Sequence, residues 1–110
     1  MVEGSLGSAD YLGLVDTGSS FVILPEGDCE NLGLVRDEKR RKVLILTVKG
    51  ETVGDLYVAP SLIVMGTNLS LKNVEVLAKT IHGMPCILGM NFLRQFDWRF
   101  SKEKQEFTIS

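Results

Sequence analysis

The chain has 110 residues, of which 45% are apolar and 24% are charged, and its net charge is −2. This length suits a single domain spanning residues 1–110, and the composition excludes disorder, collagen-like repeats and low complexity. The slightly negative charge also argues against nucleic acid as a partner, because nucleic-acid-binding domains usually carry a basic patch.

Short β-strands are the main structural prediction. Turn signals recur about every 8 to 12 residues, and Val, Ile, Leu, Thr and aromatic residues fill the segments between them, which indicates a mainly β barrel or sandwich. In chain order the expected strands are residues 11–15, 21–24, 43–48, 55–58, 62–64, 69–71, 74–77, 86–88, 98–100 and 106–109.

Three turns are expected between these strands. Gly50 and Gly54 lie between two apolar runs, and glycine adopts positive φ at no steric cost, so residues 48–55 predict a hairpin. The polar residues 66–68 and 101–104 predict the other two turns.

One short helix is expected in the C-terminal half, over residues 91–96. Phe92, Leu93 and Phe96 fall on one face at helical spacing, and Asn91 can cap the first turn. The spacing predicts that this helix packs under the sheet.

The C-terminal segment predicts a hairpin with one apolar face. Trp98 and Phe100 alternate with polar residues, as do Phe107 and Ile109. We expect these aromatic side chains in the core. This argues against a small β-barrel that binds nucleic acid or sugar, since such a barrel needs an exposed aromatic or basic surface.

The strongest chemical signal lies in residues 14–20, where Asp16 directly follows an apolar strand. Thr17 and Ser19 supply hydroxyl groups, and Gly18 allows close approach of the backbone, so this segment is suited to a catalytic loop. The alternative interpretation is an ordinary polar turn, because Asp, Gly and Ser are the commonest turn residues.

A second element, about seventy residues further on, supports the interpretation of residues 14–20 as a catalytic loop. Residues 87–93 form an apolar segment that passes through Gly89 into the predicted helix. With a glycine-containing hairpin between the two elements, the chain resembles the retropepsin-like aspartic proteases over nearly its full length. The C-terminal hairpin is similar to the cellular and prokaryotic members.

The resemblance implies a retropepsin-like acid-protease β-barrel that is active as a two-fold homodimer. It assigns catalysis to Asp16, Thr17 and Gly18, with the Thr17 hydroxyl bonded across the two-fold axis. Leu88 and Gly89 would brace the catalytic loop from below, with Ser19 in support. The tip of the flap would consist of Lys49, Gly50, Glu51 and Thr52.

One motif per chain requires two chains for the implied chemistry. Paired carboxylates share one proton and activate water together, and a two-fold axis would bring Asp16 beside its own copy. We therefore predict an aspartic endopeptidase of acidic pH preference that binds a polypeptide in extended form. A hydrogen bond from Ser19 to ionised Asp16 would extend activity to lower pH. The alternative is a catalytically silent dimerisation or peptide-binding module.

No cofactor or metal is expected, because His82 is the only histidine and Cys29 and Cys86 lie far apart without metal-ligand spacing. The cysteine pattern also fits a reducing compartment. No apolar run approaches the roughly 18 to 20 residues of a membrane span, and no signal peptide is evident. We therefore expect a cytoplasmic location without membrane contact.

Overall fold

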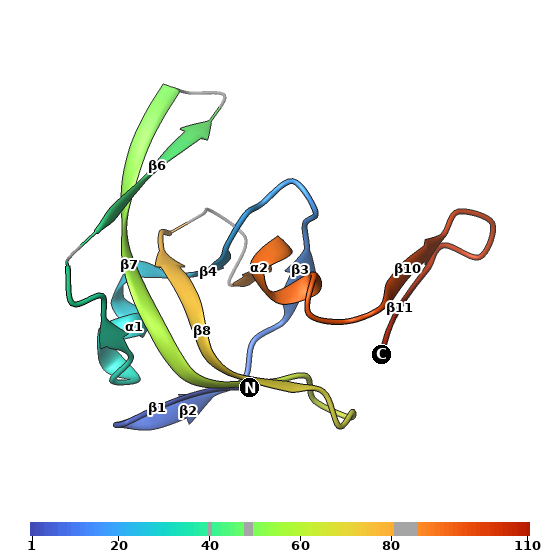
Figure 1. Ribbon diagram of the computed structural model, residues 1–110, viewed down its shortest axis with the longest axis horizontal. Helices are drawn as coiled ribbons and strands as arrows, with labels where there is room; N and C mark the ends of the chain where they lie inside the picture. The colour runs from blue at the N-terminus through green and yellow to red at the C-terminus, as the bar shows by residue number, and fades with distance from the viewer. Residues whose placement is uncertain (40, 48–49, 81–85) are drawn as a thin grey trace.

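The computed structural model describes residues 1–39, 41–47, 50–80 and 86–110. These residues form a mainly β structure with a strongly curled sheet and two short helices (Figure 1). The strands are β1 (Val2–Gly4), β2 (Gly7–Ala9), β3 (Gly13–Val15), β4 (Val22–Leu24), β5 (Val35–Arg36), β6 (Lys42–Thr47), β7 (Gly50–Ile63), β8 (Ser70–Ala78), β9 (Cys86–Leu88), β10 (Trp98–Ser101) and β11 (Glu106–Ile109). The helices are α1 (Glu26–Asn31) and α2 (Met90–Leu93).

The sheet connects segments that are far apart in the sequence. Its strand order is β2-β1-β7-β8-β4-β9-β3, with β5 and β6 also paired to β7. Most neighbours are antiparallel, but β3 runs parallel to β9 and β4 runs parallel to β8. The mainly β prediction is therefore confirmed, and strand β3, which leads to Asp16, occupies one end of this order.

Two pairs of predicted strands are in fact single long strands. The expected segment 55–58 and residues 62–63 of the next segment belong to β7, and residues 70–71 and the segment 74–77 belong to β8. Strand β7 continues through Pro60, although proline cannot donate to a ladder. Pro60 lies opposite Asn73, whose φ of 55° takes that residue out of regular pairing, and the ladder resumes on both sides.

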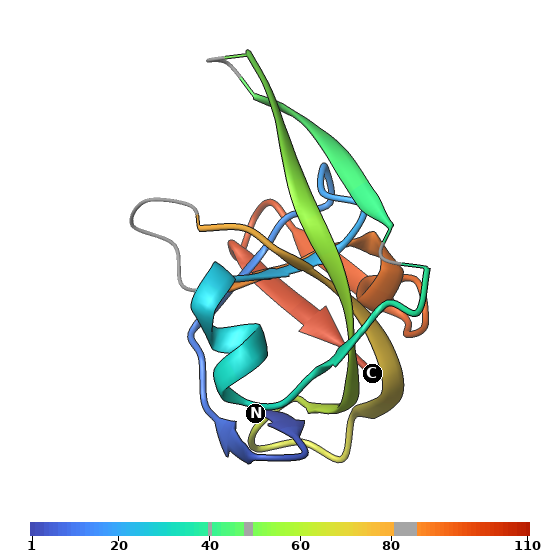
Figure 2. The same cartoon turned by 90° about the vertical axis from the view of Figure 1, so that its left-hand side faces the viewer.

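The N-terminal half contains elements that were not predicted. Strands β1 and β2 form a hairpin, β5 pairs with β7, and α1 fills one end of the curled sheet (Figure 2). The helix predicted over residues 91–96 corresponds to α2, which spans Met90–Leu93. Helix α1 was not predicted, because it is short, contains Gly27 and shows no apolar periodicity. It is held by the completely buried Cys29 and by the hydrogen bond from the Leu34 N–H to the Cys29 carbonyl.

The core has two parts because consecutive residues of a strand point to opposite faces. The larger cluster includes the fully buried Val22, Leu24 and Phe92. The smaller cluster, on the other face, is formed by Ile23, Leu77 and Ile87 with the partly buried Phe21, Val43 and Ile45. This second cluster packs the β6–β7 hairpin against β4, β8 and β9.

The β6–β7 hairpin projects beyond the rest of the chain (Figures 1 and 2). Its register pairs Thr47 with Gly50 and Val43 with Gly54, so the prediction that Gly54 belongs to the turn was wrong. Gly50 does have a positive φ, of 120°. Lys49, predicted at the tip, lies outside the described residues.

The C-terminal hairpin forms a separate two-stranded sheet. Trp98 pairs with Ile109 and Phe100 with Phe107, which confirms the predicted single apolar face. Phe107 and Ile109 pack against the larger core cluster. Phe100, however, is 59% exposed and Trp98 is 36% exposed, so the expectation that both lie in the core was wrong.

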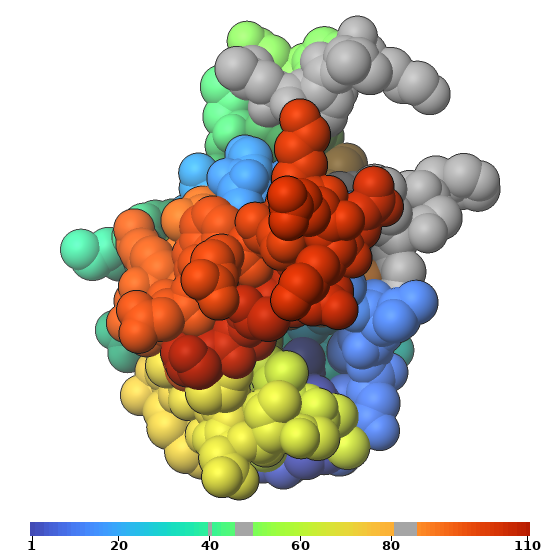
Figure 3. Space-filling model, turned by 90° about the vertical axis from the view of Figure 1, so that its right-hand side faces the viewer, coloured from blue at the N-terminus to red at the C-terminus, as the bar shows by residue number. Residues whose placement is uncertain are grey.

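The C-terminal hairpin crosses the middle of one face of the molecule, beside blue N-terminal segments (Figure 3).

Within the described part of the chain, no helix is long and apolar enough to cross a membrane.

Candidate active site

The loop that carries Asp16 begins where β3 ends. Strand β3 pairs with β9 in the order Gly13 with Cys86, Leu14 with Ile87 and Val15 with Leu88. The Asp16 N–H extends this ladder by donating to the Leu88 carbonyl at 3.1 Å. The acid is therefore fixed to the end of a paired strand, and its carboxylate leaves the sheet at a defined point.

The loop is closed by its own hydrogen bonds. The Gly18 N–H donates to the Asp16 carboxylate at 2.9 Å, and the Ser19 N–H donates to the Asp16 carbonyl at 3.1 Å. Asp16 is half-buried, whereas Thr17 and Gly18 are exposed. A Cβ at position 18 would lie 3.2 Å from the Asp16 carboxylate oxygen, so glycine allows this tight turn around the acid.

Ser19 does not make the side-chain contact that we expected. Its hydroxyl donates to the Phe21 carbonyl at 2.8 Å instead of to the Asp16 carboxylate. The Ser19 carbonyl accepts a hydrogen bond from the Met90 N–H at 2.8 Å. Ser19 therefore supports the loop through its link to α2, and the expected extension of activity to lower pH loses its structural basis.

Gly89 brings the chain before α2 into close contact with the end of the loop. A Cβ at this position would lie 2.2 Å from the Phe21 carbonyl oxygen and 2.5 Å from its carbonyl carbon, both backbone atoms. No side chain fits at such distances. Gly89 is therefore the residue that lets β9 and α2 pack directly beneath the segment that follows Asp16.

Asn91 contributes a support that the sequence did not reveal. We expected it to cap α2, but the helix begins one residue earlier and has no side-chain cap. The Asn91 side chain instead accepts a hydrogen bond from the Val22 N–H at 2.9 Å and donates to the Glu75 carbonyl at 2.8 Å. It thus joins β4, β8 and α2 behind the loop, which is a long-range role that local sequence patterns cannot indicate.

The β6–β7 hairpin contains three of the four residues that we expected at the tip of the flap, namely Gly50, Glu51 and Thr52. Gly50 and Glu51 are exposed near the end of the hairpin. Thr52 is half-buried, and its hydroxyl accepts a hydrogen bond from the Lys79 ammonium at 3.1 Å. Val43 and Ile45, on the same hairpin face as Thr52, contact the smaller core cluster next to β9.

Other acidic residues form hydrogen bonds or ion pairs away from the Asp16 loop. Asp28 accepts a hydrogen bond from the Tyr11 hydroxyl at 2.6 Å, and Asp55 forms ion pairs with Arg36 and Lys42. Burial and this bond to Asp28 raise the pKa of Tyr11. Among the described residues, no group of three or more His, Cys, Asp or Glu side chains is placed to hold a metal ion. His82 lies outside these residues.

Both cysteines are free and buried. Burial raises the pKa of Cys29 to about 12 and that of Cys86 to about 11. Because the thiolate is the reactive form, we expect neither thiol to react with a thiol reagent at pH 7 until the protein unfolds. Counting modified thiols with and without denaturant checks this, and rapid labelling of the folded protein would contradict it.

The same pKa values set the direction of an effect on stability at high pH. Above the ordinary thiol pKa, the unfolded chain releases these two protons while the folded chain retains them. The contribution of the two thiols to stability is therefore complete below about pH 8.5 and declines as the pH rises through the folded pKa values. Denaturant unfolding at pH 7 and pH 10 measures the decline.

The fold and this loop define the class of protein. The structure is similar to the crystal structure of a retropepsin-like aspartic protease from Rickettsia conorii, with a TM-score of 0.64 and 26% sequence identity. The match covers 86% of this chain and 69% of the other. The chain therefore has a retropepsin-like fold.

A family model identifies the relationship more closely. Residues 2–95 match the family described as "gag-polyprotein putative aspartyl protease". The chain belongs to this family, and the resemblance noted in its sequence is confirmed. No curated protein gives a match to the chain.

Proposed function

We propose that this protein is an aspartic endopeptidase in which Asp16 of two identical chains activates the water that hydrolyses a peptide bond. The observation that carries this proposal is the position of Asp16 at the end of a paired strand, in a loop closed by Gly18 and supported through Leu88. Membership of an aspartic protease family supports the same chemistry. Such a loop holds the carboxylate in one orientation, as general acid–base catalysis requires.

The homodimer is part of this proposal because the reaction needs a second carboxylate. Two close carboxylates share one proton, so that one acts as base toward water and the other as acid toward the carbonyl oxygen. The exposed Thr17 hydroxyl would bond across the two-fold axis to the partner's loop. The exposed apolar side chains of Trp98 and Phe100 support an interface at the C-terminal hairpin.

A polypeptide substrate would bind in extended form beneath the β6–β7 hairpin, which acts as the flap. Gly50 and Glu51 would contact it near the tip, together with Lys49. Val43 and Ile45 on the inner face of the flap are only partly buried and offer apolar surface to substrate side chains, whereas Ile23 and Ile87 below them are buried in the core. Backbone hydrogen bonds to an added strand give affinity, and such apolar contacts give side-chain preference.

A cytoplasmic location also belongs to the proposal and is supported by the two free thiols.

The direct test is cleavage of an unfolded protein by the purified chain between pH 3 and pH 7. Protein concentration should be varied and the dimer followed by sedimentation. We expect cleavage that increases toward acidic pH and depends on the concentration of dimer. A folded dimer without activity at any pH would favour the alternative of a silent dimerisation or peptide-binding module.

The interface at the C-terminal hairpin is tested by Phe100→Asp. A buried charge at a two-fold interface is repeated in both chains, so we expect the dimer dissociation constant to rise at least about a hundredfold. Activity per chain should fall in parallel and recover at high protein concentration. Thr108→Asp, on the polar face of the same hairpin, is the control. Unchanged dimerisation of the Phe100 variant would place the interface elsewhere.

A further inference from the structure

The β6–β7 hairpin depends on contacts at its base. Strand β7 pairs with β8 only from Asp55 onward, so residues 50–54 pair with β6 alone. An isolated two-stranded hairpin is marginally stable in water. The orientation of this hairpin therefore depends on the packing of Val43 and Ile45 against the smaller core cluster and on how β6 is attached to the body of the molecule.

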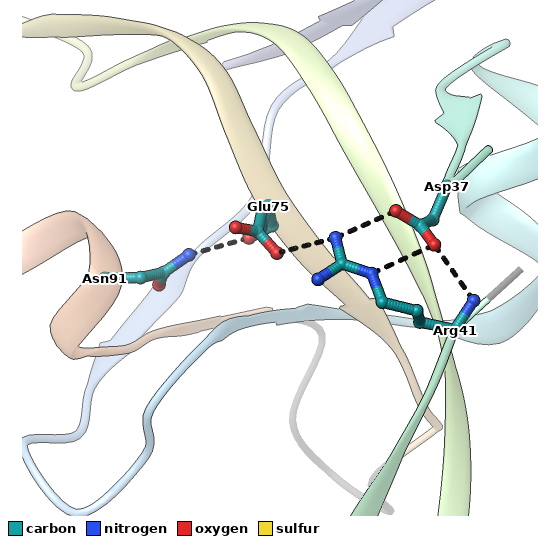
Figure 4. Close-up of polar contacts among 4 residues, drawn as sticks. All are labelled: Asp37, Arg41, Glu75 and Asn91. Carbon is teal, nitrogen blue, oxygen red and sulfur yellow. Dashed lines mark hydrogen bonds and ion pairs between the residues drawn. The ribbon is translucent and has the colours of Figure 1, made fainter. Parts of the chain in front are cut away.

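The attachment is a clasp between Asp37 and Arg41. The Asp37 carboxylate accepts three hydrogen bonds from Arg41, which come from the backbone N–H at 2.9 Å, Nε at 3.1 Å and Nη2 at 2.9 Å (Figure 4). A guanidinium that meets a carboxylate through two nitrogens is among the stronger and more directional contacts in proteins. The bond donated by the Arg41 backbone N–H closes the loop between β5 and β6.

This clasp lies at the point that determines the register of β6. The Asp37 N–H donates to the Leu56 carbonyl, and the Leu56 N–H donates to the Arg41 carbonyl. Both ends of the loop therefore meet one residue of β7, and β6 starts directly after Arg41. A shift of one residue would turn Val43 outward and the exposed Leu44 inward, because side chains alternate along a strand.

Arg41 also connects the hairpin to the segment behind the catalytic loop. Its Nη2 lies 3.9 Å from a Glu75 carboxylate oxygen, and the Glu75 carbonyl accepts the hydrogen bond from Asn91 (Figure 4). Asn91 in turn holds the Val22 N–H. The exposed pair of Arg41 and Glu75 contributes little by itself, but it completes a continuous path between the hairpin base and β4.

We propose that Arg41 is a positioning residue for substrate binding, because its clasp with Asp37 fixes the register of the flap strand and its link through Glu75 and Asn91 aligns the flap with the catalytic loop. This inference rests on the proposed function, since it assigns the β6–β7 hairpin the role of flap. Arg41 itself contacts neither substrate nor Asp16.

The clasp is suited to acidic conditions. The bonds from the Arg41 side chain, followed by those from backbone N–H groups, lower the pKa of Asp37 to about 2. A lowered carboxylate pKa gives a contribution that is complete above the ordinary value near 4 and is lost only as the pH falls through the folded value. Lys42, together with Arg36, likewise lowers the pKa of Asp55 at the adjacent pair of β6 and β7. The base of the flap should therefore keep the full contribution of the clasp from about pH 4 to pH 7.

The test compares Arg41→Met and Asp37→Asn with the wild type at pH 5. We expect KM to rise about tenfold with kcat nearly unchanged, because a misaligned flap weakens substrate binding but leaves the paired aspartates in place. Arg41→Lys keeps the charge but cannot form the two-nitrogen contact. Its KM should therefore stay close to that of Arg41→Met. The control is Glu38→Gln, an exposed residue of the same loop.

Hydrogen exchange gives a readout that does not depend on activity. Amides of residues 42–56 should exchange about tenfold faster in both clasp variants, while those of β4 and β9 keep wild-type rates. The double variant should be no worse than either single variant, because both remove the same contact. Wild-type exchange in the hairpin together with an unchanged KM would overturn the inference. If the wild type shows no peptidase activity, the proposed function fails, while the exchange still tests the clasp.

Discussion

Replacing Asp16 with asparagine should abolish peptide hydrolysis while leaving a folded dimer. Asparagine preserves the size of the side chain, and its amide oxygen can still accept the Gly18 N–H, so the loop should persist. It cannot take or give the proton that the reaction needs. Since a positioned acid or base contributes about 10²- to 10⁴-fold, and a dimer of the variant loses both carboxylates, kcat should fall by at least about 10⁴-fold. Single-turnover cleavage assays at pH 3 to 7 measure this.

Mixing the two proteins separates a shared site from two independent ones. If chains exchange freely, an equal mixture contains only about a quarter wild-type dimers, and a mixed dimer carries a single Asp16. Activity per total chain should then approach a quarter of the wild-type value. A value of one half would mean that each chain works alone, which would contradict the paired-aspartate mechanism. Asp28→Asn, a change to a carboxylate that binds Tyr11, serves as the control for loss of an acidic residue.

Gly89→Ala should be among the most destabilising single substitutions in the chain. The new methyl group would meet the backbone of Phe21 at 2.2 Å, and backbone cannot move aside as a flexible side chain can. Overpacking of this kind costs about 3 kcal/mol of unfolding free energy or more, a large share of the typical total of about 5–15 kcal/mol. Urea unfolding of both proteins measures the difference.

Gly27→Ala is the matched control for that experiment. Gly27 lies within α1, and apart from its chain neighbours and the backbone of its own helix no atom lies within 4 Å of the position of an added Cβ. Alanine favours a helix by about 1 kcal/mol over glycine, so this variant should be as stable as the wild type or slightly more stable. Equal stability of the Gly89 and Gly27 variants would show that β9 can move away from Phe21 at little cost.

Strands with a clear apolar pattern could be predicted from the sequence, whereas their pairing could not. Residues 86–88 and 106–109 form strands with the expected bounds. The long strands β7 and β8 were each predicted as two short strands, whereas their ladder continues on both sides of Pro60, because Asn73 opposite it adopts a positive φ. Helix α1 depends on the burial of Cys29 by distant strands, and no local pattern of 3.6 residues reveals such a tertiary contact.

The candidate site was predictable to the extent that its chemistry resides in contiguous residues. The segment from Asp16 to Gly18 and the segment around Gly89 are short local patterns, and the structure brings them together. The predicted side-chain partner of Ser19 was wrong, because its hydroxyl donates to the Phe21 carbonyl, and a sequence does not show which nearby acceptor a hydroxyl faces. The bridge made by Asn91 joins three elements that are distant in the sequence, which places it outside any local pattern.

The parallel pairing of β3 with β9 has a consequence for the time at which the site can form. Gly13 pairs with Cys86, so the strand that leads to Asp16 has no partner until most of the chain has been synthesised. Contacts between residues so far apart form late and slowly, because a long loop must close before they give any stabilisation. On a ribosome, the Asp16 loop therefore stays unsupported until β9 and α2 have emerged. A nascent chain thus carries the Asp16 motif long before it carries an ordered Asp16 loop, which delays assembly of the proposed active site until β9 and α2 have been made.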